Sequence, residues 1–396
     1  MSPLTSDVVV IGGGVIGTSI AYHLARRKVR VTLIEKGDLA AGSSGACDGL
    51  VLLQSKRPGI HLRLALESKT HFETLRDRLP YPIEYHGCGG MVLIESPEEF
   101  DVMRRYIRDQ QASGLDVALL VAAATRELEP ELSEAVIGAA YSPMDGQVNP
   151  LALTHGLALG ARQFGATIRT HTSVTGIEIE GNRIRGVVTR REKISTACVV
   201  NAAGAYAPRI GEMAGVAVPI RPRRGQILVT EPTAPLIHHC MISARYIAAK
   251  YNPDLARDAG DGISMEQTES GNLLLGSTRE FVDFDRRNTP EGLHGIARKT
   301  ARILPGLTRL NIIRAFAGLR PYTPDGLPIM GAVDGLDGFF IAAGHEGDGI
   351  ALSPITGALM AQLIVDGKTE LPLEAFRLER FEAQAREKKA DAETED

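Results

Sequence analysis

Three glycines near the N-terminus have the spacing of a nucleotide-binding turn. Gly12, Gly14 and Gly17 read G-x-G-x-x-G, directly after an apolar strand predicted over residues 7–11 and at the start of a helical segment. Glu35 ends the next predicted strand. The glycines allow a tight turn and close approach of a pyrophosphate to the helix N-terminus, and the carboxylate can accept hydrogen bonds from ribose hydroxyls. The pattern predicts a dinucleotide site rather than a tight turn alone.

Two further stretches of small residues decide between FAD and a nicotinamide nucleotide. The stretch "AAGSSGAC" follows Glu35 closely, and its Ser43, Ser44 and Gly45 are placed to donate hydrogen bonds to phosphates. Far downstream, "VVNAAGAYA" is predicted to be a strand that runs into a turn at Gly204. With the fingerprint at the N-terminus, these stretches favour FAD over a dissociable nicotinamide. The predicted cofactor-binding residues are Gly12, Gly14, Val15, Ile16, Gly17, Glu35, Lys36, Ser43, Ser44, Gly45, Val174, Ala203, Gly204, Gly318, Gly344, Gly347, Gly349 and Ile350.

The composition is that of an ordinary globular protein. Its 396 residues, 44% hydrophobic and 23% charged, allow at least one large core and as many as two domains. The net charge of −4 gives no basic footprint for nucleic acid. We see no signal-peptide pattern and no apolar run of about 20 residues, so no transmembrane helix is expected. The four cysteines lack metal-binding spacing, which predicts no metal site and favours a reducing, cytoplasmic setting.

Hydrophobic periodicity predicts a mixed α/β chain whose N-terminal unit recurs later. Helices are expected over 60–79, near 97–112, from Asn149 as the cap, near 290–304 and from near Ile350, with hairpin turns at 181–182 and 270–272. We predict two interleaved domains. The first, the FAD-binding domain, comprises residues 1–80, 145–220 and 320–385; the second, the substrate domain, comprises 81–144 and 221–319; and residues 386–396 are a polar tail expected to be disordered.

Motifs along nearly the whole chain carry a family resemblance. The stretches "VVVIGGGVIGTSIAYHLAR", "LIEKG", "GSSG", "VVNAAGAYA", "GLRPYTPDGLPIMG" and "AAGHEGDGIALSPITG" occur in the order and spacing of the D-amino acid oxidase superfamily of FAD enzymes. The chain most resembles glycine-oxidase-like enzymes and, through "ACDGL" and "GHEGDGI", the flavin subunits of opine oxidase, hydrogen cyanide synthase and D-hydroxyproline or proline dehydrogenase. The resemblance implies a Rossmann-like FAD-binding domain interleaved with a substrate domain built on an antiparallel sheet.

The resemblance also implies a substrate site beside the flavin. Arg320 in "GLRPYTPDG" matches the position that binds the substrate carboxylate, a task that suits a guanidinium fork, although a structural ion pair is the alternative. Tyr322 shares its face if the segment is extended. Tyr246 lies where related enzymes place a substrate-facing tyrosine, and packing is the alternative for both tyrosines. Glu266 and Gln267, on a predicted strand, are weaker candidates for ligand contact.

The loop "GHEGDGI" departs from the glycine-oxidase pattern. In the resemblance it lies beside the flavin ring, and the following helix points its N-terminus at the ring edge where negative charge develops. Glycine-oxidase-like enzymes often have a basic residue here, whereas this chain has Glu346 and Asp348. Such carboxylates suit the substrate ammonium or a basic side chain rather than a second carboxylate. Alternatively, Asp348 caps the helix and Glu346 faces solvent or a partner chain, while His345 contacts the flavin edge or simply packs.

The predicted reaction is FAD-dependent oxidation of the carbon–nitrogen bond of a small amino or imino acid. Candidate substrates are glycine or a D-amino acid, proline or hydroxyproline, an opine, and a basic amino acid such as arginine. Hydride transfer to flavin N5 would give an imine that hydrolyses to a keto acid. The FAD is predicted to be non-covalent, because the positions where relatives attach it, 318–319 and 46–47, hold no suitable cysteine or histidine in the family's register.

Several alternatives stay open. The chain is expected to be oligomeric, and it could be the flavin subunit of a dye-linked dehydrogenase that needs iron–sulfur partner subunits, since it has no cluster motif of its own. An NAD-dependent dehydrogenase is a further alternative. A purified protein that stays yellow through desalting would exclude it. An FAD-bearing protein without turnover is the other class, and Arg320 argues against it.

Overall fold

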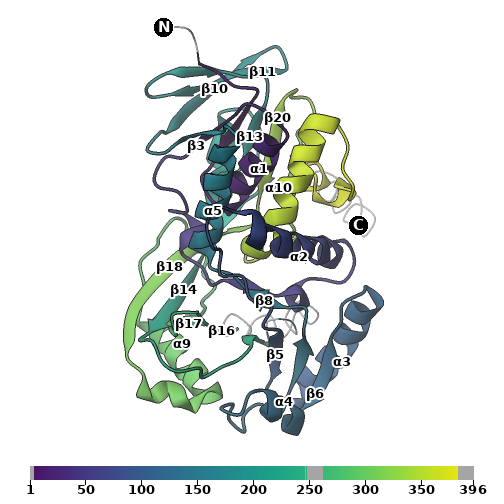
Figure 1. Ribbon diagram of the computed structural model, residues 1–396, viewed down its shortest axis with the longest axis vertical. Helices are drawn as coiled ribbons and strands as arrows, with labels where there is room; N and C mark the ends of the chain where they lie inside the picture. The colour runs from purple at the N-terminus through teal and green to yellow at the C-terminus, as the bar shows by residue number, and fades with distance from the viewer. Residues whose placement is uncertain (1–3, 246, 248–261, 382–396) are drawn as a thin grey trace, which may run out of the picture.

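The protein is divided between two large sheets, one above the other in Figure 1. The computed structural model describes residues 4–245, 247 and 262–381. Helices α1 (Val15–Arg26), α5 (Pro150–Gln163) and α10 (Gly349–Asp366) accompany the upper, six-stranded sheet, and α2 (Ile60–Arg78) lies near the junction with the lower, eight-stranded sheet. The predicted α/β architecture is therefore confirmed.

The six-stranded sheet has the order β19-β20-β13-β2-β3-β9. All neighbours are parallel except β19 and β20. Strands buried on both faces read as continuous apolar runs, which is why β2 is "VVVI" and all four of its residues are buried. The strands are β2 (Val8–Ile11), β3 (Val31–Ile34), β9 (Thr167–Arg169), β13 (Val199–Asn201), β19 (Ile329–Ala332) and β20 (Phe339–Ala343).

The eight-stranded sheet has the order β18-β14-β17-β16-β15-β5-β7-β6. It is antiparallel, as expected, apart from one pair, β5 and β15, which run parallel. The register of β14 and β18 sets Arg223 opposite Arg320. The strands are β5 (Gly90–Ile94), β6 (Ala118–Val121), β7 (Gly138–Ser142), β14 (Arg221–Thr230), β15 (Cys240–Ser243), β16 (Ser264–Gln267), β17 (Leu273–Gly276) and β18 (Ile312–Tyr322).

Helix boundaries follow the capping residues of the sequence. The side chain of Asn149 accepts hydrogen bonds from the backbone of Leu151 and Ala152, both at 3.1 Å, and Pro150 opens α5 as predicted. Thr289 caps α9 (Pro290–Ile303) in the same way, by accepting from the backbone of Gly292. The remaining helices are α3 (Pro97–Ala112), α4 (Ala122–Leu128) and α6 (Ala207–Glu212), and the 3-10 turns are Ser43–Gly45, Leu53–Ser55, Gly204–Tyr206, Pro305–Arg309 and Glu374–Phe376. The short helices α4 and α6 were not predicted.

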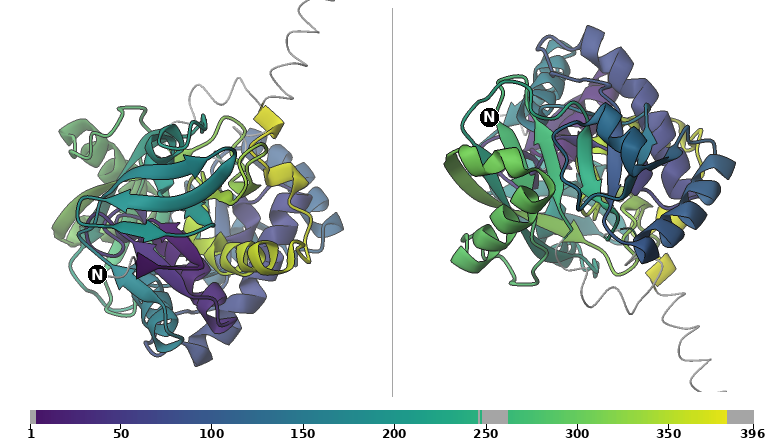
Figure 2. Two further views of the ribbon diagram at one scale, coloured as in Figure 1. Left: turned by 90° about the horizontal axis from the view of Figure 1, so that it is seen from above. Right: turned by 90° about the horizontal axis from the view of Figure 1, so that it is seen from below.

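Two small sheets complete the fold. The four-stranded sheet, β1 (Leu4–Thr5), β12 (Lys193–Ser195), β11 (Arg183–Thr189) and β10 (Val174–Glu180), lies at the top of the molecule, as the left view of Figure 2 shows. The predicted hairpin turn at 181–182 joins β10 to β11. Strands β4 (Leu50–Val51) and β8 (Gly146–Gln147) form a two-stranded sheet between the large ones.

Helix α10 is long and apolar enough to cross a membrane by length and composition alone, with a mean hydropathy of 1.4. In the structure 67% of it is buried, and it packs against α1 and α2. This is the environment of a core helix in a globular protein.

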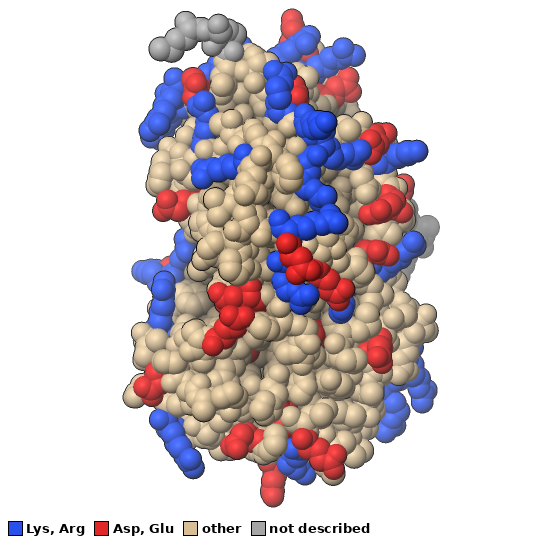
Figure 3. All heavy atoms as spheres, viewed as in Figure 1, with Lys and Arg blue, Asp and Glu red and all other residues tan. Residues whose placement is uncertain are grey.

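On the face shown in Figure 3, positive and negative side chains are interspersed.

The sheets draw on separated stretches of chain. The six-stranded sheet uses residues from the beginning, middle and end of the sequence, whereas the eight-stranded sheet uses residues 90–142 and 221–322. We propose that the two sheets mark the interleaved FAD-binding and substrate domains. The expected tail, 386–396, lies outside the described residues.

Candidate active site

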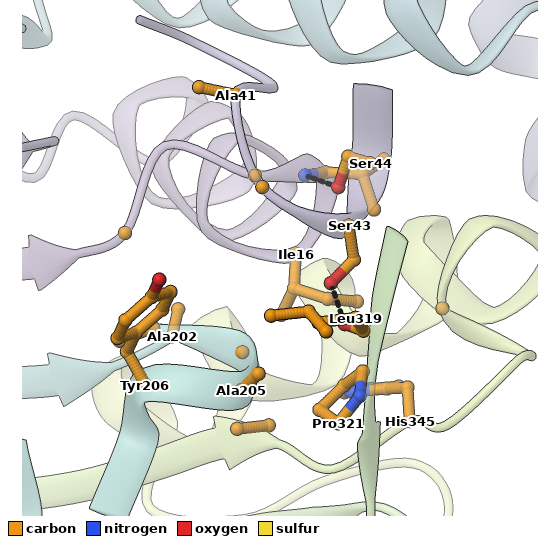
Figure 4. A pocket seen from close by; sticks show the side chains of 18 of the residues that line it. Ile16, Ala41, Ser43, Ser44, Ala202, Ala205, Tyr206, Leu319, Pro321 and His345 are labelled. Carbon is orange, nitrogen blue, oxygen red and sulfur yellow. Dashed lines mark hydrogen bonds between the residues drawn. The ribbon is translucent and has the colours of Figure 1, made fainter. Parts of the chain in front are cut away.

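A cavity of about 530 Å³ lies between the two large sheets. Its walls come from the glycine fingerprint, the serine stretch, the turn after β13, the end of β18 and the loop before α10. Figure 4 shows how Ser43 and Ser44, Tyr206, Leu319 and His345 surround this space. Segments far apart in the sequence therefore meet at one site.

The glycine fingerprint begins α1 at the edge of the cavity. Gly12, Gly14, Val15 and Ile16 line the cavity. Gly17 does not, because it packs against the preceding turn: a Cβ there would lie 1.9 Å from the carbonyl oxygen of Gly12. The Val15 N–H donates to Ser44 Oγ, but Gly14 has no side chain to cap the helix, so other backbone N–H groups of the first turn are open to a phosphate.

Glu35 and Lys36 lie at the end of β3. The Glu35 carboxylate accepts from the backbone of Gly13 at 2.7 Å and of Gly37 at 2.8 Å, and the residue lines the cavity. These bonds fix the carboxylate beside the fingerprint while leaving lone pairs for a ribose hydroxyl. The Lys36 ammonium lies 3.0 Å from the centre of the Tyr206 ring.

The serine stretch ties the two sheets together. Ser44 Oγ accepts from the backbone of Val15 at 3.0 Å, which leaves its own proton for a phosphate. Ser43 Oγ instead donates to the carbonyl oxygen of Leu319 on β18, as the dashed line in Figure 4 shows. Gly45 lies outside the cavity lining. Of the three predicted phosphate donors, Ser44 has the geometry that fits best.

The opposite wall includes residues that the sequence analysis predicted and others that it missed. Val174, Ala203, Gly204 and Gly318 all line the cavity, as predicted for cofactor contact. Tyr206, Arg209 and Arg286 are among the lining residues that were not predicted. Tyr206 and Arg209 directly follow the turn at Gly204 and could have been flagged from that motif, whereas nothing in the sequence around Arg286 marks it.

Arg320, a half-buried residue of β18, lines the cavity from the eight-stranded sheet. Its Nη2 donates to Ser277 Oγ at 2.7 Å and its Nη1 to the carbonyl oxygen of Thr278 at 3.0 Å. Gly225 leaves room for it, because a Cβ there would lie 2.1 Å from Nη1. Burial lowers the pKa of Arg320 from its usual value, but a guanidinium stays charged throughout the physiological range.

The loop before α10 lines the cavity with backbone and with one of its two carboxylates. Gly344, Gly347, Gly349 and Ile350 reach the cavity, as does Glu346. No side chain caps the helix, so the alternative that the Asp348 side chain does so is not what the structure shows. Like α1, α10 thus presents open N–H groups to the cavity.

Each carboxylate of this loop has a basic partner from a distant strand or turn. Glu346 forms an ion pair with Arg223. Burial opposes its ionisation, but Arg223, Arg320 and Arg279 together hold the pKa of Glu346 below its usual value. Asp348 is outside the cavity lining, and its Oδ1 lies 2.7 Å from Lys56 Nζ. Both carboxylates are therefore already paired with basic residues of the protein, and neither is free to bind a basic side chain of a substrate.

The other predicted residues divide between the cavity and the packing around it. His345 lines the cavity, and its Nε2 lies 3.1 Å from Thr356 Oγ1. Tyr322 packs edge-on against Phe281 outside the cavity lining. Gln267 accepts from the backbone of Leu236 at 2.7 Å, away from the cavity. Tyr246 lies outside the described residues.

An acidic residue that the sequence analysis overlooked lies beside Cys47. Asp48 lines the cavity, and its Oδ2 accepts from Ser264 Oγ at 2.9 Å. Glu266 is buried behind it, with both carboxylate oxygens 2.9 Å from the backbone nitrogen of Gly49. Burial and then the charge of Asp48 raise the pKa of the Cys47 thiol well above its usual value. In the described part of the chain, no cluster of three or more metal-ligating side chains occurs.

Comparison with known proteins decides the family. The model of the DAO family, described as "FAD dependent oxidoreductase", matches residues 7–363. The chain belongs to this family. It is 33% identical over 381 residues to glycine oxidase of Geobacillus kaustophilus, which covers 94% of this chain and 97% of that protein. It is 30% identical over 403 residues to an opine oxidase subunit of Rhizobium meliloti, at 96% and 99% coverage.

A solved structure agrees with the sequence comparisons. The L-proline dehydrogenase of P. horikoshii has a TM-score of 0.89 and 32% identity, and the likeness covers 96% of this chain and 99% of that chain. The predicted family, fold class and cofactor are thus confirmed. The protein is an FAD-dependent oxidoreductase for amino-acid-like substrates, and the open N-termini of α1 and α10 fit a dinucleotide cofactor.

Proposed function

We propose that this protein binds FAD non-covalently and oxidises the carbon–nitrogen bond of a small α-amino or imino acid to an imine, which water hydrolyses to the keto acid. The bound FAD supplies the hydride acceptor at N5. The residues of the chain have the tasks of binding the substrate carboxylate, orienting the carbon that bears nitrogen and excluding water. The fixed guanidinium of Arg320 in the cavity is the observation that carries the proposal.

Arg320 is prepared to receive a carboxylate. A guanidinium has five N–H donors, and Ser277 and Thr278 take one each, so N–H groups remain for a ligand. Because the two acceptors directly follow β17, the side chain is held in place before substrate arrives, which lowers the entropy lost on binding. Charge-assisted pairing of this kind is stronger than a neutral hydrogen bond.

The ion pairs around the loop before α10 narrow the substrate class. A basic side chain, as in arginine or an arginine-derived opine, would need a carboxylate of its own in the cavity. Glu346 and Asp348 were the candidates, and they are engaged by Arg223 and Lys56. We therefore favour a small substrate with one carboxylate, such as glycine or proline. The names of two relatives, glycine oxidase and L-proline dehydrogenase, support this choice.

Anaerobic titration of the purified flavoprotein tests the proposal. Glycine, sarcosine, D- and L-proline, hydroxyproline, arginine and an opine would be added in turn, and the visible flavin band would be followed. We expect bleaching by one of the small monocarboxylates. Bleaching by arginine or the opine alone would contradict the substrate class that we propose.

Two arginine variants on β18 sharpen the test. Arg320→Ala should raise the apparent Kd of the reducing substrate by about a hundredfold or more with FAD retained, because a buried charge-assisted pair is lost. Arg314→Ala, at an exposed position of the same strand, is the matched control and should leave the Kd unchanged. Equal behaviour of the two variants would overturn the assignment of Arg320.

A second candidate is a flavin subunit that is reduced by substrate but needs partner subunits for turnover. The name of one relative, a subunit of opine oxidase, favours it. In that case substrate would bleach the isolated chain, while molecular oxygen would reoxidise it far more slowly than an artificial dye. Rapid reoxidation by oxygen would favour an oxidase. The predicted oligomer and cytoplasmic location stay predictions, the first open to measurement by light scattering.

A further inference from the structure

Asp48 presents a carboxylate to the cavity from the loop after the serine stretch. Its Oδ2 accepts from Ser264 Oγ on β16 at 2.9 Å. From the described part of the chain, no other hydrogen bond or ion pair reaches this carboxylate. Since Asp48 lines the cavity, its Oδ1 is available to a ligand.

Asp48 and Arg320 flank the same short stretch of the sheet. Ser264, the partner of Asp48, is opposite Gly276 in the ladder of β16 and β17. The next residue, Ser277, is the partner of Arg320. Gly276 itself is close to the carboxylate, since a Cβ there would lie 3.9 Å from Asp48 Oδ2. An acceptor for a cation and a donor for a carboxylate thus lie side by side in the cavity wall.

Glu266 gives a second reason for a cation at Asp48. It lies on the protein side of Asp48, is 4% exposed, and shares the backbone nitrogen of Gly49 between its two oxygens. Burial and the charge of Asp48 raise the pKa of Glu266 well above its usual value. A buried carboxyl group beside a second carboxylate favours a proton or a cation next to the pair. The side of the pair that is open to the cavity is Asp48.

We propose that Asp48 binds the amino group of the substrate through Oδ1, while Arg320 binds the carboxylate, and that Glu266 positions Asp48 from behind. The inference rests on the proposed function and deepens it. The two opposite charges match the α-carboxylate and the adjacent nitrogen of an amino or imino acid. A ligand that carries a carboxylate but no amino group can pair with Arg320 alone and should bind more weakly. Asp48 is therefore a determinant of specificity for nitrogen-bearing acids.

Binding of two probes to the FAD-loaded protein tests this assignment. The dissociation constants of glycine or L-proline, whichever reduces the flavin, and of acetate would be measured anaerobically from changes in the flavin spectrum. For Asp48→Asn we expect at least tenfold weaker binding of the amino acid, with acetate bound equally well or more tightly because a negative charge has gone. Asp116→Asn, an exposed change just before β6 at the far edge of the eight-stranded sheet, should alter neither constant.

The outcomes separate this inference from the proposed function. If Asp48→Asn keeps its affinity for the amino acid while Arg320→Ala loses it, the proposed function stands and the role of Asp48 is overturned. Equal weakening of acetate and amino acid would also overturn it. A wild-type protein that no amino acid reduces would overturn both. Should Asp48→Asn lose FAD, Ser264→Ala replaces it: releasing Oδ2 should weaken amino-acid binding several-fold with no effect on acetate.

Discussion

The ammonium of Lys56 lies 2.7 Å from Asp348 Oδ1, and the lysine is only 1% exposed to solvent. Lys56 also donates to the carbonyl oxygen of Leu52 and to Ser55 Oγ. His61 lies on the other side, with its Nε2 3.3 Å from Asp348 Oδ2. Since Asp348 immediately precedes α10, this buried pair fixes the start of the helix that faces the cavity.

Removal of Lys56 should destabilise the protein strongly. Breaking a buried ion pair from one side leaves a poorly compensated buried charge, at a cost of about 3–5 kcal/mol. We expect that loss in the free energy of unfolding for Lys56→Met, measured by urea denaturation. Lys69→Met, which breaks the surface pair with Glu73, should cost about 0.5 kcal/mol or less. Similar losses for the two variants would show that the buried pair has no special weight.

A methyl group at Gly17 should abolish FAD binding. The Cβ would lie 1.9 Å from the carbonyl oxygen of Gly12, so the turn and the start of α1 must move. We expect Gly17→Ala to purify with little FAD, as read from the ratio of visible to ultraviolet absorbance. Gly295→Ala on α9, where nothing lies within 4 Å of the added Cβ, is the control. A fully loaded Gly17→Ala protein would contradict the role assigned to the fingerprint.

His345 should make stability fall in mild acid. Burial lowers the pKa of His345 from 6.5 to about 3. Between these values the unfolded chain binds a proton that the folded chain does not, so this histidine costs about 1.4 kcal/mol of stability for each pH unit below 6.5. His345→Gln should reduce the slope of unfolding free energy between pH 6.5 and 4. His155→Gln, an exposed change, should leave that slope unaltered; an unaltered slope in both would refute the prediction.

Glu346 should tune the affinity of the site for anions. It is the counter-ion of Arg223 and also interacts with Arg320. Glu346→Gln removes one negative charge next to the carboxylate-binding guanidinium, so acetate should bind several-fold more tightly to the FAD-loaded protein. The measurement is the dissociation constant from the flavin spectrum at low ionic strength. Weaker binding would mean that Glu346 holds Arg223 and Arg320 in place rather than opposing their charge.

The sequence predicted those features that depend on residues close together in the chain. The fingerprint of Gly12, Gly14 and Glu35 and the Asn149 cap of α5 need only neighbouring residues to be recognised. The partners of Glu346 and Asp348 could not be predicted in this way. Their ion pairs depend on which distant strands and turns come together, and that depends on the pairing of whole sheets.

Asp48 is a residue that local sequence patterns failed to identify at all. The sequence analysis examined positions 46–47 only for flavin attachment and predicted none there, and nothing in "ACDGL" marks the aspartate as chemically active. Its significance appears only when β16 and β17 place Ser264 and Ser277 beside each other, and with them Asp48 and Arg320.

The contact of the serine stretch with β18 limits how this enzyme can be recombined. Ser43 donates to Leu319, and the residues that follow pack so closely that a Cβ on Gly318 would lie 2.1 Å from the carbonyl oxygen of Ala46. The loop belongs by sequence to the FAD half, but it delivers Asp48 to the substrate half. In a chimera that takes residues 81–144 and 221–319 from a relative, the contact between the serine stretch and β18 would join residues of two different proteins. Residues 43–48 should therefore be exchanged together with these two segments. We therefore expect substrate preference to depend on residues from both of the proposed domains.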